Sequence, residues 1–161
     1  MQKLINQSAI LDNNWAFIES VESALPTGSI IIPASYWLEN KASLASRTDI
    51  GIWLDSDAEI ELYIKEISEL PLIAINFPAF ANGRGYSLAR LIKERTEFKG
   101  ELRAIGDVLL DQLFFMKRCG FNTFLLKEGL SAEKALEYLE TFEDPYQLAY
   151  DKPSPLFRRK G

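Results

Sequence analysis

The chain carries one short segment whose residue types suit the binding of an anion: Asn82-Gly83-Arg84-Gly85-Tyr86-Ser87. Glycine tolerates positive φ angles and lets the backbone approach a ligand closely, and the N-terminus of a helix offers free N–H groups to negative charge. An arginine in the same turn can add a bidentate contact to sulfate, phosphate or a carboxylate. The segment therefore predicts an anion site. The alternative is a tight strand-to-helix turn in which Arg84 pairs with a carboxylate of the protein.

Arg103 is the second candidate, because it stands inside the apolar run Leu102-Arg103-Ala104-Ile105. An unpaired buried charge costs several kcal/mol, so this arginine needs either a ligand or a carboxylate partner. The nearby carboxylates are Glu101, Asp107 and Asp111. On strand alternation Arg103 shares a face with Asp107, and in a curved sheet that face would be the concave one.

Further residues complete the predicted site. Asp107 and Asp111 are four positions apart, so on a helix they can face the same way and anchor arginines or hold Mg²⁺, although Asp107 can instead simply cap the helix. Lys127 follows a predicted strand, a usual place for a phosphate-binding or Schiff-base lysine; the alternative is a solvated lysine beside Glu128. We predict no metal site, and we predict the following set: Gly83, Arg84, Gly85, Ser87, Arg103 and Lys127 as anion-binding residues, supported by Asn82, Tyr86, Asp107 and Asp111.

The elements that must position these residues alternate between short apolar runs and helical patterns, which is typical of βα units and a parallel sheet. The predicted strands cover residues 50–54, 72–77, 100–105 and 122–126, and the predicted helices cover 58–70, 88–96, 108–119 and 132–142. Asp55 and Asp57 would cap the first of these helices, and Ser87 the second. The candidate residues then follow the carboxyl ends of strands, where parallel α/β sheets place their sites.

We predict a single α/β domain over residues 1–161, with four or five mostly parallel strands and its core βα units at about 50–142. The first 48 residues can add a strand, and residues 146–150 form either a last strand or an extended tail. The Pro-rich basic end, residues 151–161, is expected to be mobile. Short loops favour sequential strand order, curved like half of a (βα)₈ barrel; the alternative is a flat three-layer doubly wound sandwich.

Composition excludes several kinds of site. The chain has no histidine and one cysteine, Cys119, so Cys/His zinc sites and Ser-His-Asp or Cys-His catalysis are excluded. The GxG of residues 83–85 lacks the third glycine of a dinucleotide fingerprint, and we predict no cofactor. A net charge of −5 argues against nucleic acid or a membrane surface as partner. We expect a cytoplasmic protein, because the chain opens without a signal peptide and has no membrane-length apolar run.

Three motifs in register resemble one bacterial family. They are FPAF followed by GRGYSLAR (residues 77–80 and 83–90), GELRAIGDVLLDQL (100–113) and RCGFNTF (118–124). Together they resemble the family called domain of unknown function 934, often labelled a probable oxidoreductase and typically encoded beside assimilatory sulfite reductase. The family pattern has Asp before GRG where this chain has Asn82, so the resemblance assigns no acid–base role there.

The resemblance implies an accessory protein of assimilatory sulfite or sulfate reduction. We expect it to act as a binding or partner protein with an anion pocket at the carboxyl ends of its strands; the alternative is a small enzyme of sulfur assimilation, either lyase-like or a cofactor-dependent oxidoreductase. The expected partners are a small anion (sulfate, sulfite or a phosphorylated compound) and sulfite reductase. A second copy of the chain is a further expected partner, because the edges and concave face of the sheet need cover.

Overall fold

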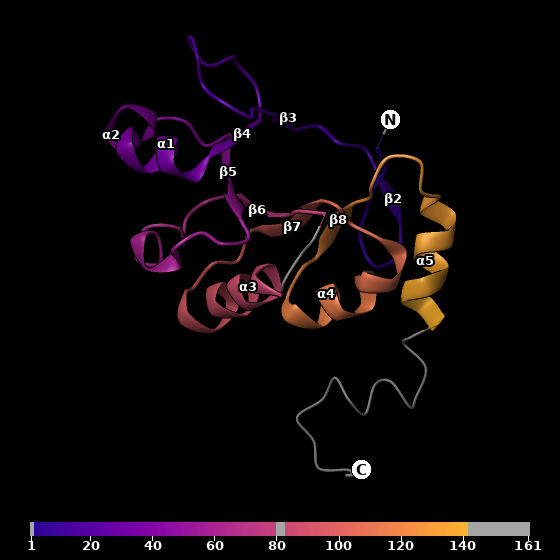
Figure 1. The fold of residues 1–161 in the computed structure, drawn as a ribbon. Helices are drawn as coiled ribbons and strands as arrows, with labels where there is room; N and C mark the ends of the chain where they lie inside the picture. The colour runs from indigo at the N-terminus through magenta and orange to yellow at the C-terminus, as the bar shows by residue number, and fades with distance from the viewer. Residues whose placement is uncertain (1, 80–82, 142–161) are drawn as a thin grey trace.

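A computed structural model describes residues 2–79 and 83–141, and within them one sheet holds eight strands (Figure 1). The strands are β1 (Leu4–Ile5), β2 (Ile10–Leu11), β3 (Ala16–Phe17), β4 (Ile30–Pro33), β5 (Ile50–Asp55), β6 (Leu72–Phe77), β7 (Glu101–Gly106) and β8 (Thr123–Leu125). Strands β3 to β8 pair parallel in the order of the sequence, and β1 and β2 add antiparallel beyond β8. The predicted α/β fold with sequential, half-barrel-like order is confirmed. A doubly wound sandwich requires one reversal of the order of its parallel strands, and strands β3 to β8 show none.

Helices follow most of the parallel strands. They are α1 (Ala34–Glu39), α2 (Lys41–Leu44), α3 (Arg84–Arg95), α4 (Leu113–Cys119) and α5 (Ala132–Thr141), with 3₁₀ turns η1 (Ile60–Leu62) and η2 (Leu110–Gln112). The first 48 residues contribute four short strands, where the sequence analysis allowed for one, so the predicted total of four or five strands is too low. The possible strand at 146–150 and the tail at 151–161 lie outside the described residues.

Two helix predictions are wrong in detail. Residues 58–70 form only η1 and turns, although the isoleucines at 60, 64 and 67 are all buried as predicted. Their spacing reflects burial against the sheet, and β-branched residues lower helix propensity. The predicted helix 108–119 begins as the 3₁₀ turn η2 and becomes α-helical only at Leu113.

The sheet curls because its two edge strands are neighbours in the sequence. Strands β2 and β3 lie at opposite edges, yet only residues 12–15 connect them. Five extended residue steps reach about 18 Å, whereas a flat sheet of eight strands at their usual spacing would be about 34 Å wide. The edges must therefore approach each other. Residues 12–15, which we call the strap, run across the mouth of the resulting concave face (Figure 1).

The two faces of the sheet have separate cores. The convex face packs under the helices in one large apolar cluster that includes Ile52, Ile75 and Phe124. The concave face holds a small cluster, Ile31, Leu72, Ala74 and Ile105, against which Trp15 of the strap packs with Trp53 and Leu125. Strands β4 to β7 are buried on both faces, as near-continuous apolar runs indicate.

A polar network ties the strap to the concave face. Arg103 is 2% exposed, and its Nε and Nη2 donate to Glu101 Oε2 at 3.0 and 2.8 Å. Thr123 Oγ1 donates to the same oxygen at 2.7 Å. The remaining Nη1 of Arg103 donates to Asn13 Oδ1 of the strap at 3.1 Å, and that oxygen also accepts the backbone N–H of Trp15.

We predict that Asn13→Ala destabilises the protein by about 1.5–3 kcal/mol, because it removes the acceptor of a hydrogen bond from a buried charged group. Urea unfolding would measure the change in the free energy of unfolding. Asn14→Ala is the matched control, since Asn14 is the exposed neighbour in the same strap and should change stability by no more than about 0.5 kcal/mol. Equal stabilities for the two variants would contradict a structural role for the Asn13–Arg103 bond.

Candidate functional site

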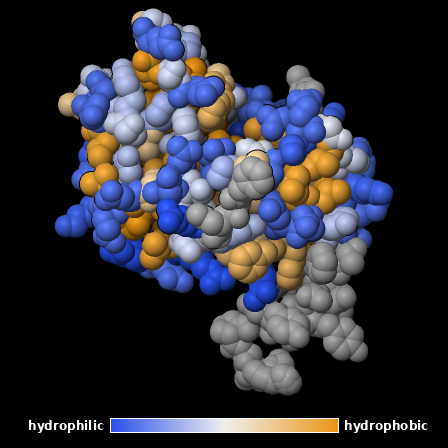
Figure 2. Space-filling view, viewed as in Figure 1, coloured by the Kyte–Doolittle hydropathy of each residue, from blue (hydrophilic) through white to orange (hydrophobic). Residues whose placement is uncertain are grey.

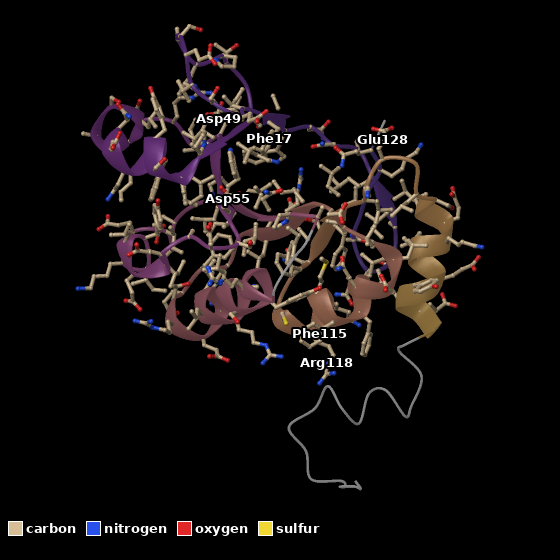
Figure 3. All side chains as sticks on the ribbon, in the orientation of Figure 1. Phe17, Asp49, Asp55, Phe115, Arg118 and Glu128 are labelled. Carbon is tan, nitrogen blue, oxygen red and sulfur yellow. The ribbon has the colours of Figure 1, made fainter. Side chains whose placement is uncertain are left out.

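Polar side chains meet at the carboxyl ends of β5 to β8. Asn76 Nδ2 donates to Asp55 Oδ1 at 3.1 Å, which joins the ends of β6 and β5. Lys127 Nζ forms an ion pair with Asp107 Oδ1 at 2.9 Å, which joins the segments after β8 and β7. Asp55 stands at the end of β5 near the centre of the view in Figure 3. The carboxyl ends of β5 to β8 therefore carry both negative and positive side chains.

Gly106 shows how tightly this edge is assembled. It ends β7 with φ of +90°, and a Cβ atom there would lie 2.3 Å from Asn76 Oδ1 and 2.5 Å from the carbonyl oxygen of Phe77. Only glycine fits such a conformation beside such neighbours. The close approach fixes the position of the Asn76 amide, whose Nδ2 reaches Asp55.

The turn before α3 places the predicted anion motif on the same side of the sheet. Gly83 has φ of +89° and takes the N-cap position, and α3 begins directly at Arg84. Ser87 lies inside the helix, where its backbone N–H donates to the Gly83 carbonyl at 3.3 Å, so the prediction that Ser87 caps the helix is wrong. Within the described residues no side chain caps this end, and the first turn contains no acidic residue. Asn82 lies outside the described residues.

Gly85 and Tyr86 have a packing role in this motif. A Cβ atom on Gly85 would lie 2.5 Å from the ring of Phe77, so glycine lets α3 approach β6. The ring of Tyr86 lies 5.0 Å from that of Phe77. Burial, and to a smaller extent the nearby Cys119 and Asp111, raises the pKa of the Tyr86 hydroxyl above its ordinary value.

The structure shows which ion pairs the candidate acidic residues form, a choice that the sequence did not decide. Asp107 pairs with Lys127, and it caps no helix, because η2 begins after Leu109. Arg103 has Glu101 as its carboxylate, one of the three that its neighbourhood offered. Asp111 lies in η2 and is exposed. The two aspartates therefore do not serve as a paired anchor for Arg103.

Sequence reasoning did not select Asp55, Asn76 or Asn13 as partners in these networks. The helix that Asp55 was predicted to cap is absent, and the Asp55 carboxylate accepts a hydrogen bond from Asn76 instead. The sequence did carry a signal for Asp55 and Asn76. They stand at the end of one predicted strand and next to the end of the following one, and such ends meet at one edge of a parallel sheet. No sequence pattern pointed to Asn13, because its hydrogen bond with Arg103 forms only when the strap crosses the concave face.

One pocket lies beside Asp55 at the carboxyl ends of the strands, and another lies at their amino ends. A shallow one of about 190 Å³ opens after β4 and β5, lined by Trp53, Tyr63, Asp55 and Asp57 among others. A larger one of about 450 Å³ opens at the amino ends of the strands, where Trp37 and Leu70 line its wall. The carboxylates of the first pocket make it unsuitable for an anion.

Among residues 2–79 and 83–141, no three side chains of His, Cys, Asp or Glu are grouped as a metal site needs. None of the described helices has the length and apolar character required to cross a membrane.

We predict that Arg103→Met lowers the free energy of unfolding by about 3 kcal/mol, because it strands the Glu101 carboxylate and the Asn13 oxygen. The double variant Arg103→Met/Glu101→Met should recover part of that loss, since replacing both partners leaves no unpaired charge. Chemical denaturation measures both. An Arg103→Met protein as stable as the wild type would instead favour a ligand-binding role for Arg103.

We also predict that Gly85→Ala destabilises the protein by about 1–3 kcal/mol through overpacking against Phe77, despite the better helix propensity of alanine. Ser87→Ala, an exposed change in the same helix, is the control and should stay within about 0.5 kcal/mol of wild type. Differential scanning calorimetry measures both variants. If Gly85→Ala were stabilising, the packing explanation of this glycine would be wrong.

Comparison with known proteins assigns the chain to a family. The family model described as "Bacterial protein of unknown function (DUF934)" matches residues 51–157, which cover well over half of the chain and all three motifs. Neither the curated proteins nor the solved structures gave a match. The chain therefore belongs to the DUF934 family of bacterial proteins.

Proposed function

We propose that this protein is an accessory binding protein of assimilatory sulfite or sulfate reduction, and that it holds a small oxyanion at the N-terminus of α3. The observation that carries the proposal is the start of α3: it follows the carboxyl end of β6, begins at a left-handed glycine and has no capping side chain among the described residues. Membership of a family typically encoded beside sulfite reductase supports the pathway.

The chemistry of the helix start suits an oxyanion. The first N–H groups of an α-helix have no partner within the helix, and the helix dipole places positive charge there. Arg84, the first residue of α3, is exposed and adds a guanidinium at the same point. A Cβ atom on Gly83 would meet no atom within 4 Å, so open space adjoins the start of the helix. An anion bound there would accept backbone N–H donors and one charged donor together.

Lys127 supplies a second cation on the same edge of the sheet. It follows β8, two strands away from β6, and its side chain is 52% exposed while it pairs with Asp107. The ion pair with Asp107 orients this lysine on the edge of the sheet. Arg103 belongs to the concave network with Glu101, and in this proposal its charge supports the site only from a distance.

We predict that sulfate, sulfite or phosphate raises the melting temperature more than chloride does at matched ionic strength. At about ten times Kd, binding adds about 1.4 kcal/mol, which corresponds to about 3–5 °C for a domain of this size. Sulfate also stabilises proteins by exclusion from their surface, so the diagnostic quantity is the difference between variants. Thermal shift and titration calorimetry measure it.

Arg84→Ala should lose the oxyanion-specific part of the shift and keep the fold. Lys99→Ala is the matched control, because it removes the same charge from an exposed residue beside the amino end of β7. The proposal fails if Arg84→Ala and Lys99→Ala respond to sulfate as the wild type does, or if titration detects no oxyanion binding.

A further inference from the structure

The surface formed by α3 and α4 differs in charge from the rest of the protein. These two helices pack beside each other and carry six of the eighteen Lys and Arg residues but only one of the twenty-three Asp and Glu residues. The whole chain has a net charge of −5. One of the six cations, Arg95, pairs with Glu61 of η1 at 2.6 Å. The other five still give these helices a positive face on a negatively charged protein, and it attracts acidic groups within about 10 Å at 0.1 M salt.

Aromatic rings stand among these cations. Phe115 is 41% exposed, and its ring centroid lies 4.8 Å from that of Tyr86. The guanidinium of Arg90 lies 5.7 Å from the ring of Phe115, and that of Arg118 lies 5.8 Å from the ring of Phe114. We call these five residues the α3–α4 face.

The figures show this face directed away from the sheet. Phe115 and Arg118 lie on the outer side of α4 (Figure 3), and the same region of the surface has pale-orange apolar atoms beside strongly hydrophilic ones (Figure 2). Phe115 packs on Tyr86, and the ring centroid of Tyr86 lies 5.0 Å from that of the buried Phe77. The exposed ring is thus supported by a column of aromatic contacts that reaches the core.

We propose that the α3–α4 face is a docking surface for a partner protein that presents an acidic patch around an aliphatic anchor. Exposed aromatic residues and arginines are the types that dominate the energy of protein interfaces. Guanidinium groups stacked on rings are already ordered, so they lose little freedom when a carboxylate binds them. Phe115 would pack against the anchor while Arg90 and Arg118 pair with acids on either side.

A protein partner fits this face better than a nucleic acid. The cations are few and are interleaved with apolar rings, and the chain as a whole repels a polyanion. This docking surface is separate from the oxyanion site at the start of α3, so either proposal can fail without the other.

A defined peptide tests the proposal. The probe is a dye-labelled amphipathic helix of about four turns, with leucines on one face and glutamates elsewhere. Fluorescence anisotropy with the full chain should show binding that weakens as salt is added. Phe115→Ser and Arg118→Glu should each weaken binding about tenfold or more, equivalent to about 1.4 kcal/mol. The same peptide with lysines in place of glutamates should not bind.

Two matched variants control for general effects of apolar loss and charge reversal. Leu62→Ser removes another exposed apolar side chain, 58% exposed in η1, and Lys65→Glu reverses an exposed charge nearby. Both should bind the peptide within about twofold of wild type, as residues outside an interface do. Circular dichroism confirms that every variant is folded.

Three results would overturn the proposal. The first is equal peptide affinity for Phe115→Ser, Arg118→Glu and the wild type. The second is a single-stranded oligonucleotide that binds this face more tightly than the acidic peptide and competes with it. The third is a dimer in light scattering that Phe115→Ser dissociates, which would assign the face to a second copy of this chain.

Discussion

The strap of residues 12–15 is the constraint on which the shape of the sheet depends. It joins strands at opposite edges, and its short reach forces eight strands to curl. Curling narrows the concave face until a few side chains can fill it. Trp15 of the strap packs against the small apolar cluster there, and Asn13 accepts a hydrogen bond from Arg103. A sheet without this link could open, and its second face would then be exposed to water.

The concave face can include a charged residue because all its hydrogen bonds are made inside the protein while its carboxylate partner still reaches water. Arg103 is buried, whereas its partner Glu101 keeps 29% of its side chain exposed. The pair therefore reaches water through the carboxylate and avoids the full desolvation of two ions. Thr123 and Asn13 satisfy further polar atoms. This network occupies the interior near the amino ends of β7 and β8.

The strands β5 to β8 could be predicted closely because each is an apolar run bounded by turn residues, and their parallel, sequential order followed from the short connections. The two-residue strands β2 and β3 could not, since they are too short to show alternation and exist through pairing with distant partners. The isoleucines at 60, 64 and 67 predicted a helix because burial in an irregular turn gives the same spacing. For the candidate site, residue types predicted an edge of the sheet at which polar side chains do meet. They could not choose between partners such as Glu101 and Asp107 for Arg103, because that choice depends on which strands curl together.

The structure also separates the two possible meanings of the Gly-Arg-Gly turn. Gly83 is required by its positive φ, and Gly85 is required because α3 lies against Phe77. Both glycines would therefore be needed if no ligand ever bound, so they cannot by themselves argue for a site.

Arg84 differs, since neither backbone conformation nor contact with Phe77 selects its guanidinium. In the proposed function, the turn therefore contributes through the Arg84 side chain and the start of α3, and not through its glycines. The positive charges of α3 and α4 would attract anions both to that start and to the outer face. The two proposals differ in the chemistry around the charge: the backbone N–H groups of a helix start suit a small oxyanion, and aromatic rings on the outer face suit a protein.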